Sequence, residues 1–324
     1  MKLGRVVASA FVCVTLGSCT GVVPANVARS DATSWMDPGA KSASQLLYVS
    51  DLGTFDVYVY QFPSLKLSGK LHGFDSPQGE CGDASGNIWI ADTKSNKVRE
   101  YAHGGAKPIA SLADPLGYPG GCAVDPSTGD LAVMNIADFS DAGAILIYKN
   151  ARGTPQVYGN SNFFYFYFGG YDRNGNLYVS GATVRGGYLL GVLTRGGKSV
   201  SLVKVTGGTL YFPGTVAWVG TTLVLGDQRC NGRAGSCFYR LRVSGRTARI
   251  AGATPLRGSC DVVQAWVTPT RIVGGDDAAY CRNGRSSTDL WPYPAGGKPA
   301  SSVPGPRVPI GAVLSVANGP SAAR

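Results

Sequence analysis

The chain has 324 residues, of which 44% are hydrophobic and only 15% are charged, so it can bury a large core. Its 46 glycines and two glutamates, beside abundant turn and strand residues, predict an all-β fold and argue against a helical one. The formal net charge of +10 predicts a basic surface, and no apolar stretch beyond the N-terminal segment is long enough to cross a bilayer.

The N-terminal segment has the features of an export signal. Two basic residues precede the apolar run 6–16, and the small residues Gly17 and Ser18 lead to Cys19. A short apolar segment of this kind is typical of a secretory signal rather than a transmembrane helix. The ending resembles the bacterial lipobox, so we predict a lipoprotein signal over 1–18 and acyl chains on Cys19 that anchor the protein to a membrane. The alternative is an ordinary signal peptide with an incidental Cys19.

Export assigns the protein to the bacterial cell envelope, on the periplasmic or extracellular side. Nucleic acid is therefore not an expected partner, despite a pI near 9.2. The segment 19–45 is polar and rich in small residues, and we expect it to be a flexible tether. Residues 318–324 are expected to form a disordered tail.

From residue 46 onward, one pattern recurs: an apolar strand that ends in a short polar residue, usually Asp. The copies end 41 to 49 residues apart, and a period of this length built from short strands is typical of β-propeller blades. Another strand and a tight turn precede each copy, and two further strands follow it, so each unit supplies a four-stranded antiparallel blade. The six copies are 47–51, 88–92, 131–135, 177–181, 223–227 and 271–276.

The two ends of the repeat region predict how the ring closes. The first copy has no inner strand before it, whereas the repeat region ends with 309–316, which matches the inner-strand pattern of 212–218. Pairing 309–316 with 46–51 completes the first blade and leaves no open sheet edge. We therefore predict a single domain, a six-bladed β-propeller over 46–317.

One unit resembles an NHL repeat: the run from Pro77 through the hairpin Asp83-Ala84-Ser85-Gly86-Asn87 and the strand Ile88-Trp89-Ile90-Ala91-Asp92 to Tyr101. It is also similar to a unit of the gluconolactonase/regucalcin-like propellers. The resemblance covers nearly all of 46–316, and it is strongest in blades two and three and weakest in blades five and six. It implies a six-bladed propeller and specifies the chemistry poorly.

The strand-end polar residues are the candidate ligand-binding residues. The end of the second strand of an antiparallel blade lies on the same rim as the start of the first, so these side chains are expected to gather around the axis on one face. Neighbouring carboxylates repel one another, which predicts a bound cation or a cationic ligand group. The candidates are Asp51, Glu80, Asp92, Asn135, Asp227 and Asp276.

Three interpretations of this acidic axial face remain open. The first is a monomeric binding or scaffold protein that presents the face to a small ligand, a glycan or a protein. The second, implied by the resemblance, is a metal-dependent hydrolase of the gluconolactonase type, with Glu80, Asn135 and Asp227 around one divalent cation such as Ca²⁺. The third is structural: an Asp at this spot accepts backbone hydrogen bonds from the adjoining turn. No catalytic residue is assigned, because His72 and His103 are the only histidines and neither lies in an axis-facing strand.

The cysteines predict disulfide bonds. Once Cys13 and Cys19 are set aside, six remain, and an even number in an exported chain indicates pairing. The first pair below closes a short Gly-rich loop, and the second joins equivalent places on neighbouring inner strands, where the alternative is two small buried residues. The candidate pairs are Cys230 with Cys237, Cys81 with Cys122, and Cys260 with Cys281.

The turns between third and fourth strands carry a basic residue in one blade after another. This basic face lies opposite the acidic one and fits anionic lipid headgroups or acidic polysaccharide, unless the charges only keep exposed turns soluble. The aromatic run 163–168 is expected to be a buried strand entering blade four. The basic residues are Lys107, Arg152, Arg195, Lys198, Arg246 and Lys298.

Overall fold

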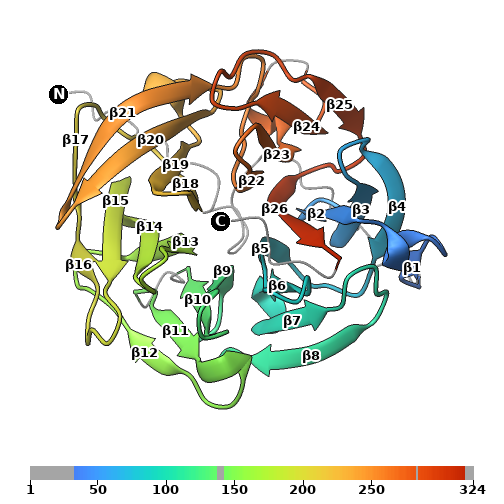
Figure 1. Cartoon of the computed structure of the whole chain (residues 1–324), viewed down its shortest axis with the longest axis horizontal. Coiled ribbons are helices and arrows are strands. Elements are labelled where there is room, and N and C mark those ends of the chain that lie inside the picture. The colour runs from blue at the N-terminus through green and yellow to red at the C-terminus, as the bar shows by residue number, and fades with distance from the viewer. Residues whose placement is uncertain (1–32, 137–141, 282–283, 318–324) are drawn as a thin grey trace, which may run out of the picture.

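The computed structural model describes residues 33–136, 142–281 and 284–317. Their strands form six sheets arranged as a ring around a central axis, which is a six-bladed β-propeller (Figure 1). The predicted fold class is therefore confirmed. The predicted signal, Cys19 and the predicted tail lie outside the described residues. Within the described residues, no helix is long and apolar enough to span a membrane.

Each blade has four antiparallel strands, and the first of them lies nearest the axis. From the axis outward, blade one contains β26 (Pro309–Val316), β2 (Gln45–Asp51), β3 (Asp56–Gln61) and β4 (Lys66–Leu71), with β1 (Trp35–Met36) added at its outer edge. Blade two contains β5 (Pro77–Gly82), β6 (Ile88–Asp92), β7 (Lys97–Tyr101) and β8 (Pro108–Ala113). Blade three contains β9 (Pro119–Val124), β10 (Leu131–Asn135), β11 (Ile145–Tyr148) and β12 (Gln156–Tyr158).

The second half of the ring repeats this plan. Blade four contains β13 (Tyr165–Tyr171), β14 (Leu177–Thr183), β15 (Gly186–Leu193) and β16 (Ser201–Leu202). Blade five contains β18 (Pro213–Val219), β19 (Thr222–Asp227), β20 (Cys237–Ser244) and β21 (Thr247–Pro255), and β17 (Lys204–Thr206) pairs with β21 in parallel. Blade six contains β22 (Ala265–Val267), β23 (Arg271–Asp276), β24 (Ser287–Pro292) and β25 (Ser301–Pro304). Short 3-10 helices are η2 (Ala40–Ser42), η3 (Thr93–Ser95), η4 (Lys149–Ala151), η5 (Cys230–Gly232) and η6 (Ala278–Tyr280).

The C-terminal strand closes the ring as predicted. β26 lies beside β2 in antiparallel register, with Leu314 opposite Leu47 and Pro309 opposite Asp51 (Figure 1). The last strand of the chain is thus the axial strand of the first blade. The inner edge of β2 is therefore paired, so blade one has the same four strands as the other blades and no open sheet edge where the two ends of the ring meet.

The predicted tether 19–45 is wrong for its described part, 33–45. Trp35 and Met36 form β1 and pair with the outer strand β4, and Ala40 is fully buried. Gly69 makes room for this strand, since a Cβ there would collide with the side chain of Met36. The added strand covers the exposed edge of blade one, a stabilisation that composition alone does not reveal.

All three predicted cysteine pairs are formed. Cys81–Cys122 joins the axial strands of blades two and three, with the Cα atoms 5.5 Å apart. Cys230–Cys237 closes the loop between β19 and β20, and Cys260–Cys281 ties the entry of blade six to the loop after β23. Three disulfides indicate an extracellular or periplasmic location, because the cytosol keeps thiols reduced.

The turns fall on two opposite faces because neighbouring strands are antiparallel. We call one the hairpin face, which holds the turns between first and second strands and between third and fourth strands. The first set is 83–87, 125–130, 172–176, 220–221 and 268–270, and the second set is 62–65, 102–107, 149–155, 194–200, 245–246 and 293–300. We call the other the loop face, which holds turns such as 52–55 and 93–96 and the segments that enter the axial strands, such as 72–76 and 305–308.

Apolar side chains fill the space between neighbouring blades. The predicted aromatic run is part of this packing, since Phe163 and Phe166 are buried between blades three and four with their rings stacked 4.6 Å apart. Near the axis the strands approach one another so closely that only glycine fits. A Cβ on Gly79 would lie 2.6 Å from the carbonyl oxygen of Gly120, and one on Gly121 would lie 2.5 Å from that of Tyr167. We call this narrow level, where Gly79 and Gly121 lie, the waist of the propeller.

Candidate functional site

The strand-end carboxylates of the loop face are bound to the backbone of their own blades. Asp92 is fully buried, accepts hydrogen bonds from the N–H groups of Asp75 and Ser76, both at 2.8 Å, and forms an ion pair with Arg99 at 2.7 Å. Each equivalent carboxylate likewise accepts at least two backbone N–H groups, most of them in the segment that enters the axial strand of its blade. These carboxylates are Asp51, Asp227 and Asp276.

Burial and these hydrogen bonds act in opposite directions on the acidity of the carboxyls. Burial raises the pKa of Asp276 to about 6, and the N–H groups of Asp261 and Cys260 oppose the shift. Burial also raises the pKa of Asp227, against three backbone N–H groups. The hydrogen bonds satisfy backbone donors that burial would otherwise leave unpaired, which is the structural role considered above.

Blades three and four depart from this pattern. Asn135 donates its side-chain N–H groups to Asp114 Oδ1 at 3.0 Å and to the carbonyl of Gly117 at 2.7 Å, so in blade three the amide is the donor and the entering segment supplies the acceptors. Blade four has Gly181 at this place and keeps no polar side chain. In most blades, the side chain at this position contacts the segment that enters the axial strand and is not free for a ligand.

Glu80 does not join these residues. It lies on β5 near Val313 of β26 and Tyr48 of β2, and only 1% of it is exposed. Burial raises the pKa of Glu80 well above its usual range, and the backbone of Val313 opposes this shift, so the site favours the protonated carboxyl. The geometry at Val313 falls short of a hydrogen bond, and neither carboxyl oxygen has another partner in the described part of the chain.

Glu80, Asn135 and Asp227 have different surroundings in the structure. Glu80 belongs to the packing between blades one and two, while Asn135 and Asp227 hold loops of blades three and five. Across residues 33–136, 142–281 and 284–317, no three His, Cys, Asp or Glu side chains are grouped so that they could hold a metal ion. The divalent-cation site of the hydrolase alternative, which includes an Asn, stays a prediction.

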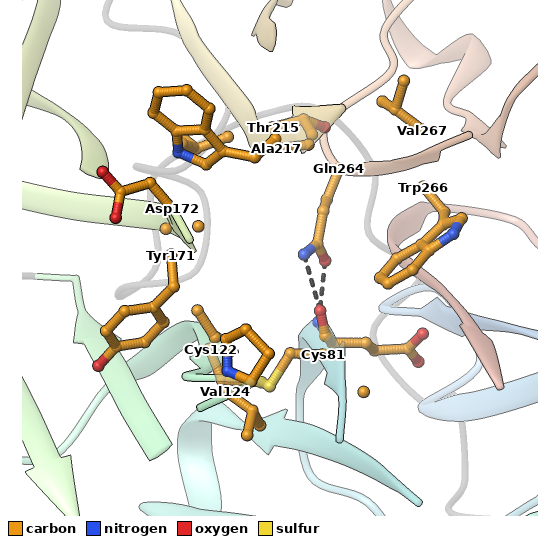
Figure 2. Close-up of a pocket in the computed structure, with 18 of the residues that line it drawn as sticks. Cys81, Cys122, Val124, Tyr171, Asp172, Thr215, Ala217, Gln264, Trp266 and Val267 are labelled. Atoms are coloured by element: carbon orange, nitrogen blue, oxygen red, sulfur yellow. Dashed lines mark hydrogen bonds between the residues drawn. A yellow bond between two sulfur atoms is a disulfide. The ribbon is translucent and has the colours of Figure 1, made fainter. Parts of the chain in front are cut away.

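A cavity of about 540 Å³ lies on the axis, on the hairpin side of the waist. Its volume falls in the range of small-molecule sites, roughly 300–1,000 Å³. The lining comes from the axial strands of all six blades and from the hairpin turns that follow several of them (Figure 2). The lining residues that lie in the axial strands or directly before them include Glu80, Cys81, Ala123, Gly170, Thr215, Ala217, Gln264, Trp266 and Ala312.

Gln264 forms the floor of this axial pocket. Its side-chain oxygen accepts a hydrogen bond from the N–H of Glu80, and its side-chain nitrogen donates to the carbonyl of Glu80, both at 2.8 Å. Gln264 belongs to blade six and Glu80 to blade two, so the amide reaches past blade one (Figure 2). The paired hydrogen bonds fix the amide across the axis and separate the pocket from the loop face.

The walls are mostly apolar and include aromatic rings. Trp218 and Trp266 are half-buried, and Trp218 packs edge-on against Tyr178 with ring centroids 5.1 Å apart. The indole N–H groups of both tryptophans have no hydrogen-bond partner in the part of the chain that the structure describes. The Cys81–Cys122 disulfide forms another part of the wall (Figure 2). Because each axial strand is paired on one side only, backbone N–H and C=O groups also face the axis.

Acidic residues at the mouth of the pocket are part of the turns. Asp83 accepts hydrogen bonds from the N–H groups of Ser85 and Asn87 at 2.8 and 2.9 Å, and Asp172 does the same for Asn174 and Asn176. Such bonds stabilise tight hairpins. The mouth therefore has polar groups, while the deeper walls carry no free ionised side chain among the described residues.

Sequence reasoning missed this site because it looked for ionisable groups at strand ends. The available signal was the size of axial side chains: Tyr171, Trp218 and Trp266 lie at or near the ends of three axial strands. A single aromatic residue in a strand is more often a core residue, and these three do lean on the core with part of their rings. Only their position around the axis shows that they also line a cavity.

No family model matches the chain, and no curated protein matches its sequence. Among solved structures, it is similar to a chain in a crystal structure of a nidogen/laminin complex, with a TM-score of 0.66, 12% identity, and coverage of 84% of this chain and 98% of that one. A protein of unknown function from Bacteroides caccae has a TM-score of 0.62 and 12% identity over 84% and 99% of the two chains. Hydrazine synthase of Kuenenia stuttgartiensis has a TM-score of 0.53 and 15% identity over 72% and 67%. Identities this low establish the propeller fold alone.

Proposed function

We propose that this chain is an exported, lipid-anchored binding protein that holds a small ligand, or a projecting group of a larger partner, in the axial pocket of the hairpin face. The observation that carries the proposal is the preformed cavity of about 540 Å³ with tryptophan in its walls. Pockets with apolar walls and a few fixed polar groups are the usual form of binding sites. The site thus moves from the acidic face favoured by sequence to the opposite face.

The course of the chain is compatible with an anchor at Cys19. The hydroxyl of Ser34 accepts a hydrogen bond from the N–H of His72, at the end of blade one's outer strand that lies on the loop face. The first described residues thus lie on the loop face, opposite the pocket.

The similarity to a chain of a nidogen/laminin complex supports a protein-binding variant of this proposal. That chain belongs to a nidogen/laminin complex, so a propeller of this shape is compatible with docking a second protein. A loop or a saccharide carried by a partner is small enough to enter the pocket, while the surrounding turns meet the rest of the partner.

Filling the pocket tests the proposed function. Ala217 lines the cavity and is only half-buried, so Ala217→Phe occupies ligand space with little effect on the core, whereas Ala295→Phe adds the same ring to an exposed turn on the same face. Titrations followed by tryptophan fluorescence, with neutral saccharides, aromatic fragments and short peptides, should show at least one class that binds wild type and Ala295→Phe. Ala217→Phe should weaken that binding about tenfold or more. Equal binding by all three proteins for every probe would overturn the proposal.

The anchor has its own test. In membrane fractions of cells that make the protein, intact mass should show cleavage before Cys19 and added acyl mass, and Cys19→Ser should move the protein to the soluble fraction. A wild-type chain without acyl mass, or a Cys19→Ser chain that stays in the membrane fraction, would refute lipidation without affecting the pocket.

A further inference from the structure

Basic residues surround the axial pocket on the hairpin face. In every blade an exposed Lys or Arg lies in the turn between the third and fourth strands or directly after it, and these six turns contain no Asp or Glu. We call these residues the basic rim. One member from each blade, in ring order, gives Lys66, Lys107, Arg152, Arg195, Arg246 and Lys298.

Most of this charge is not neutralised within the molecule. Arg195 turns inward and lies 3.6 Å from Asp125, and more than half of its side chain remains exposed. Within the described chain, no other member of the basic rim forms an ion pair. The acids nearest the pocket, such as Asp83 and Asp172, are held in their own turns on one side of the ring. Blades five and six have no acid in any turn of this face.

The same face offers nothing that would enter a bilayer. Large exposed apolar side chains among the described residues include Ile109, Val157 and Leu202, but these lie in outer strands, and none of that group lies in a hairpin-face turn. Stable attachment to a membrane surface combines basic charge with inserted apolar groups or acyl chains. A basic rim around the axial pocket favours a soluble anionic partner with a part that projects into the pocket.

We propose that the partner is an acidic polysaccharide, with one sugar ring in the axial pocket and the carboxylates or sulfates of neighbouring sugars on the basic rim. This rests on the proposed function of the pocket and names its ligand class. A pyranose has a C–H face that packs on indole rings and hydroxyls that bond to strand-edge backbone groups. The floor is the uncharged amide of Gln264 beside the buried Glu80, so it suits the hydroxyl edge of the ring, while the carboxylate of that sugar stays at the mouth.

The experiment uses the mature protein with polygalacturonate as the probe, neutral pullulan for comparison, and vesicles of phosphatidylcholine with phosphatidylglycerol. The rim variant is Arg152→Gln, Arg246→Gln and Lys298→Gln in one chain. Its matched control removes three exposed charges from the loop face: Lys94→Gln, Arg185→Gln and Arg233→Gln. Both variants lose the same net charge, so any difference reports the position of the charge and not its amount.

We expect polygalacturonate to bind wild type in a salt-sensitive manner and to change the tryptophan fluorescence. The rim variant should bind about tenfold more weakly or worse, and the control within about twofold of wild type. Ala217→Phe should lose the fluorescence change and weaken binding while keeping the salt dependence. Both effects together are specific to a ligand that occupies the rim and the pocket at once.

Several results would overturn the inference. Equal weakening by the rim and control variants indicates non-specific charge, and binding unaffected by Ala217→Phe indicates that the pocket is not used. Vesicle binding that depends on the rim, without polygalacturonate binding, assigns the face to anionic lipid. Binding of pullulan or aromatic fragments alone, blocked by Ala217→Phe, removes the acidic glycan but keeps the proposed function. No pocket-dependent probe of any class removes both.

Discussion

On both faces of the propeller, aspartates accept backbone N–H groups and so hold the turns and entering segments of the blades. The two faces differ in the side chains around the axis. On the loop face, Asp92 holds the entering segment of its blade, and on the hairpin face Asp83 holds the turn after its axial strand. Both carboxylates accept backbone N–H groups. Aspartate at the ends of strands therefore takes part in the construction of a blade on either face.

What distinguishes the faces is the size and direction of the side chains on the axis. On the loop side, one apolar cluster includes Ile136, Tyr167, Val263 and Ile310, which come from four different blades. On the hairpin side, small axial residues such as Ala217 and Ala312 leave a cavity. The described residues of the loop side thus contribute apolar packing between blades, and those of the hairpin side line an open cavity.

Removal of a loop-face carboxylate should give the largest loss of stability. Asp92→Ala leaves two buried N–H groups and the guanidinium of Arg99 without their acceptor, which costs about 3–5 kcal/mol. Asp83→Ala, at the half-buried turn, should cost about 1 kcal/mol. Urea unfolding midpoints measure both, and equal losses would contradict the view that the loop face is the more rigidly built end.

The sequence predicts the blades but not the pocket. The six blades and the closure by 309–316 were predictable because they depend on chain-local patterns: a repeated strand with its polar end, and a missing partner at the start. The pocket was not, because it depends on which of six distant axial positions carry small side chains. Ala217 and Ala312 become neighbours of a common space only after the ring has closed.

The role of the predicted acids failed to emerge for a related reason. Sequence places Asp51, Asp92, Asp227 and Asp276 on one rim, and the structure agrees. It cannot show that each carboxylate turns to the N–H groups of its own entering segment, because that segment is up to 257 residues away, as for Asp51 and Val308. The β1 strand was missed likewise, since Trp35 and Met36 are strand only by pairing with β4.

The waist that separates the two faces should tolerate no side chain at Gly79. Gly79→Ala places a Cβ 2.6 Å from the carbonyl oxygen of Gly120 and 2.7 Å from the Cα of Gly121, so two axial strands must move apart, at a cost of about 2–3 kcal/mol. Gly159→Ala is the control, because a Cβ there meets nothing within 4 Å. Thermal unfolding with circular dichroism compares them, and a Gly79→Ala protein as stable as Gly159→Ala would show that the axial strands are not in close contact.

A buried carboxyl of the loop face should make stability fall as the pH rises. Burial, and then the charges of Asp277 and Asp276, raise the pKa of Asp261 to about 8, against the opposing charge of Arg229. The folded protein therefore holds a proton that the unfolded chain releases near its ordinary pKa of about 4, so folding weakens as pH rises from about 4 to 8.

Asp261→Asn removes this cost and should stabilise the protein by about 1–3 kcal/mol at pH 8.5, and by nothing at pH 4. Asp276, whose pKa is raised to about 6, acts in the same direction in both proteins and cancels from their difference, so the two proteins should separate progressively between about pH 4 and 8. Urea unfolding at a series of pH values measures the difference, with Asp83→Asn as the control. A constant difference across the range would mean that Asp261 stays ionised, and that the loop face is more open to water than its packing implies.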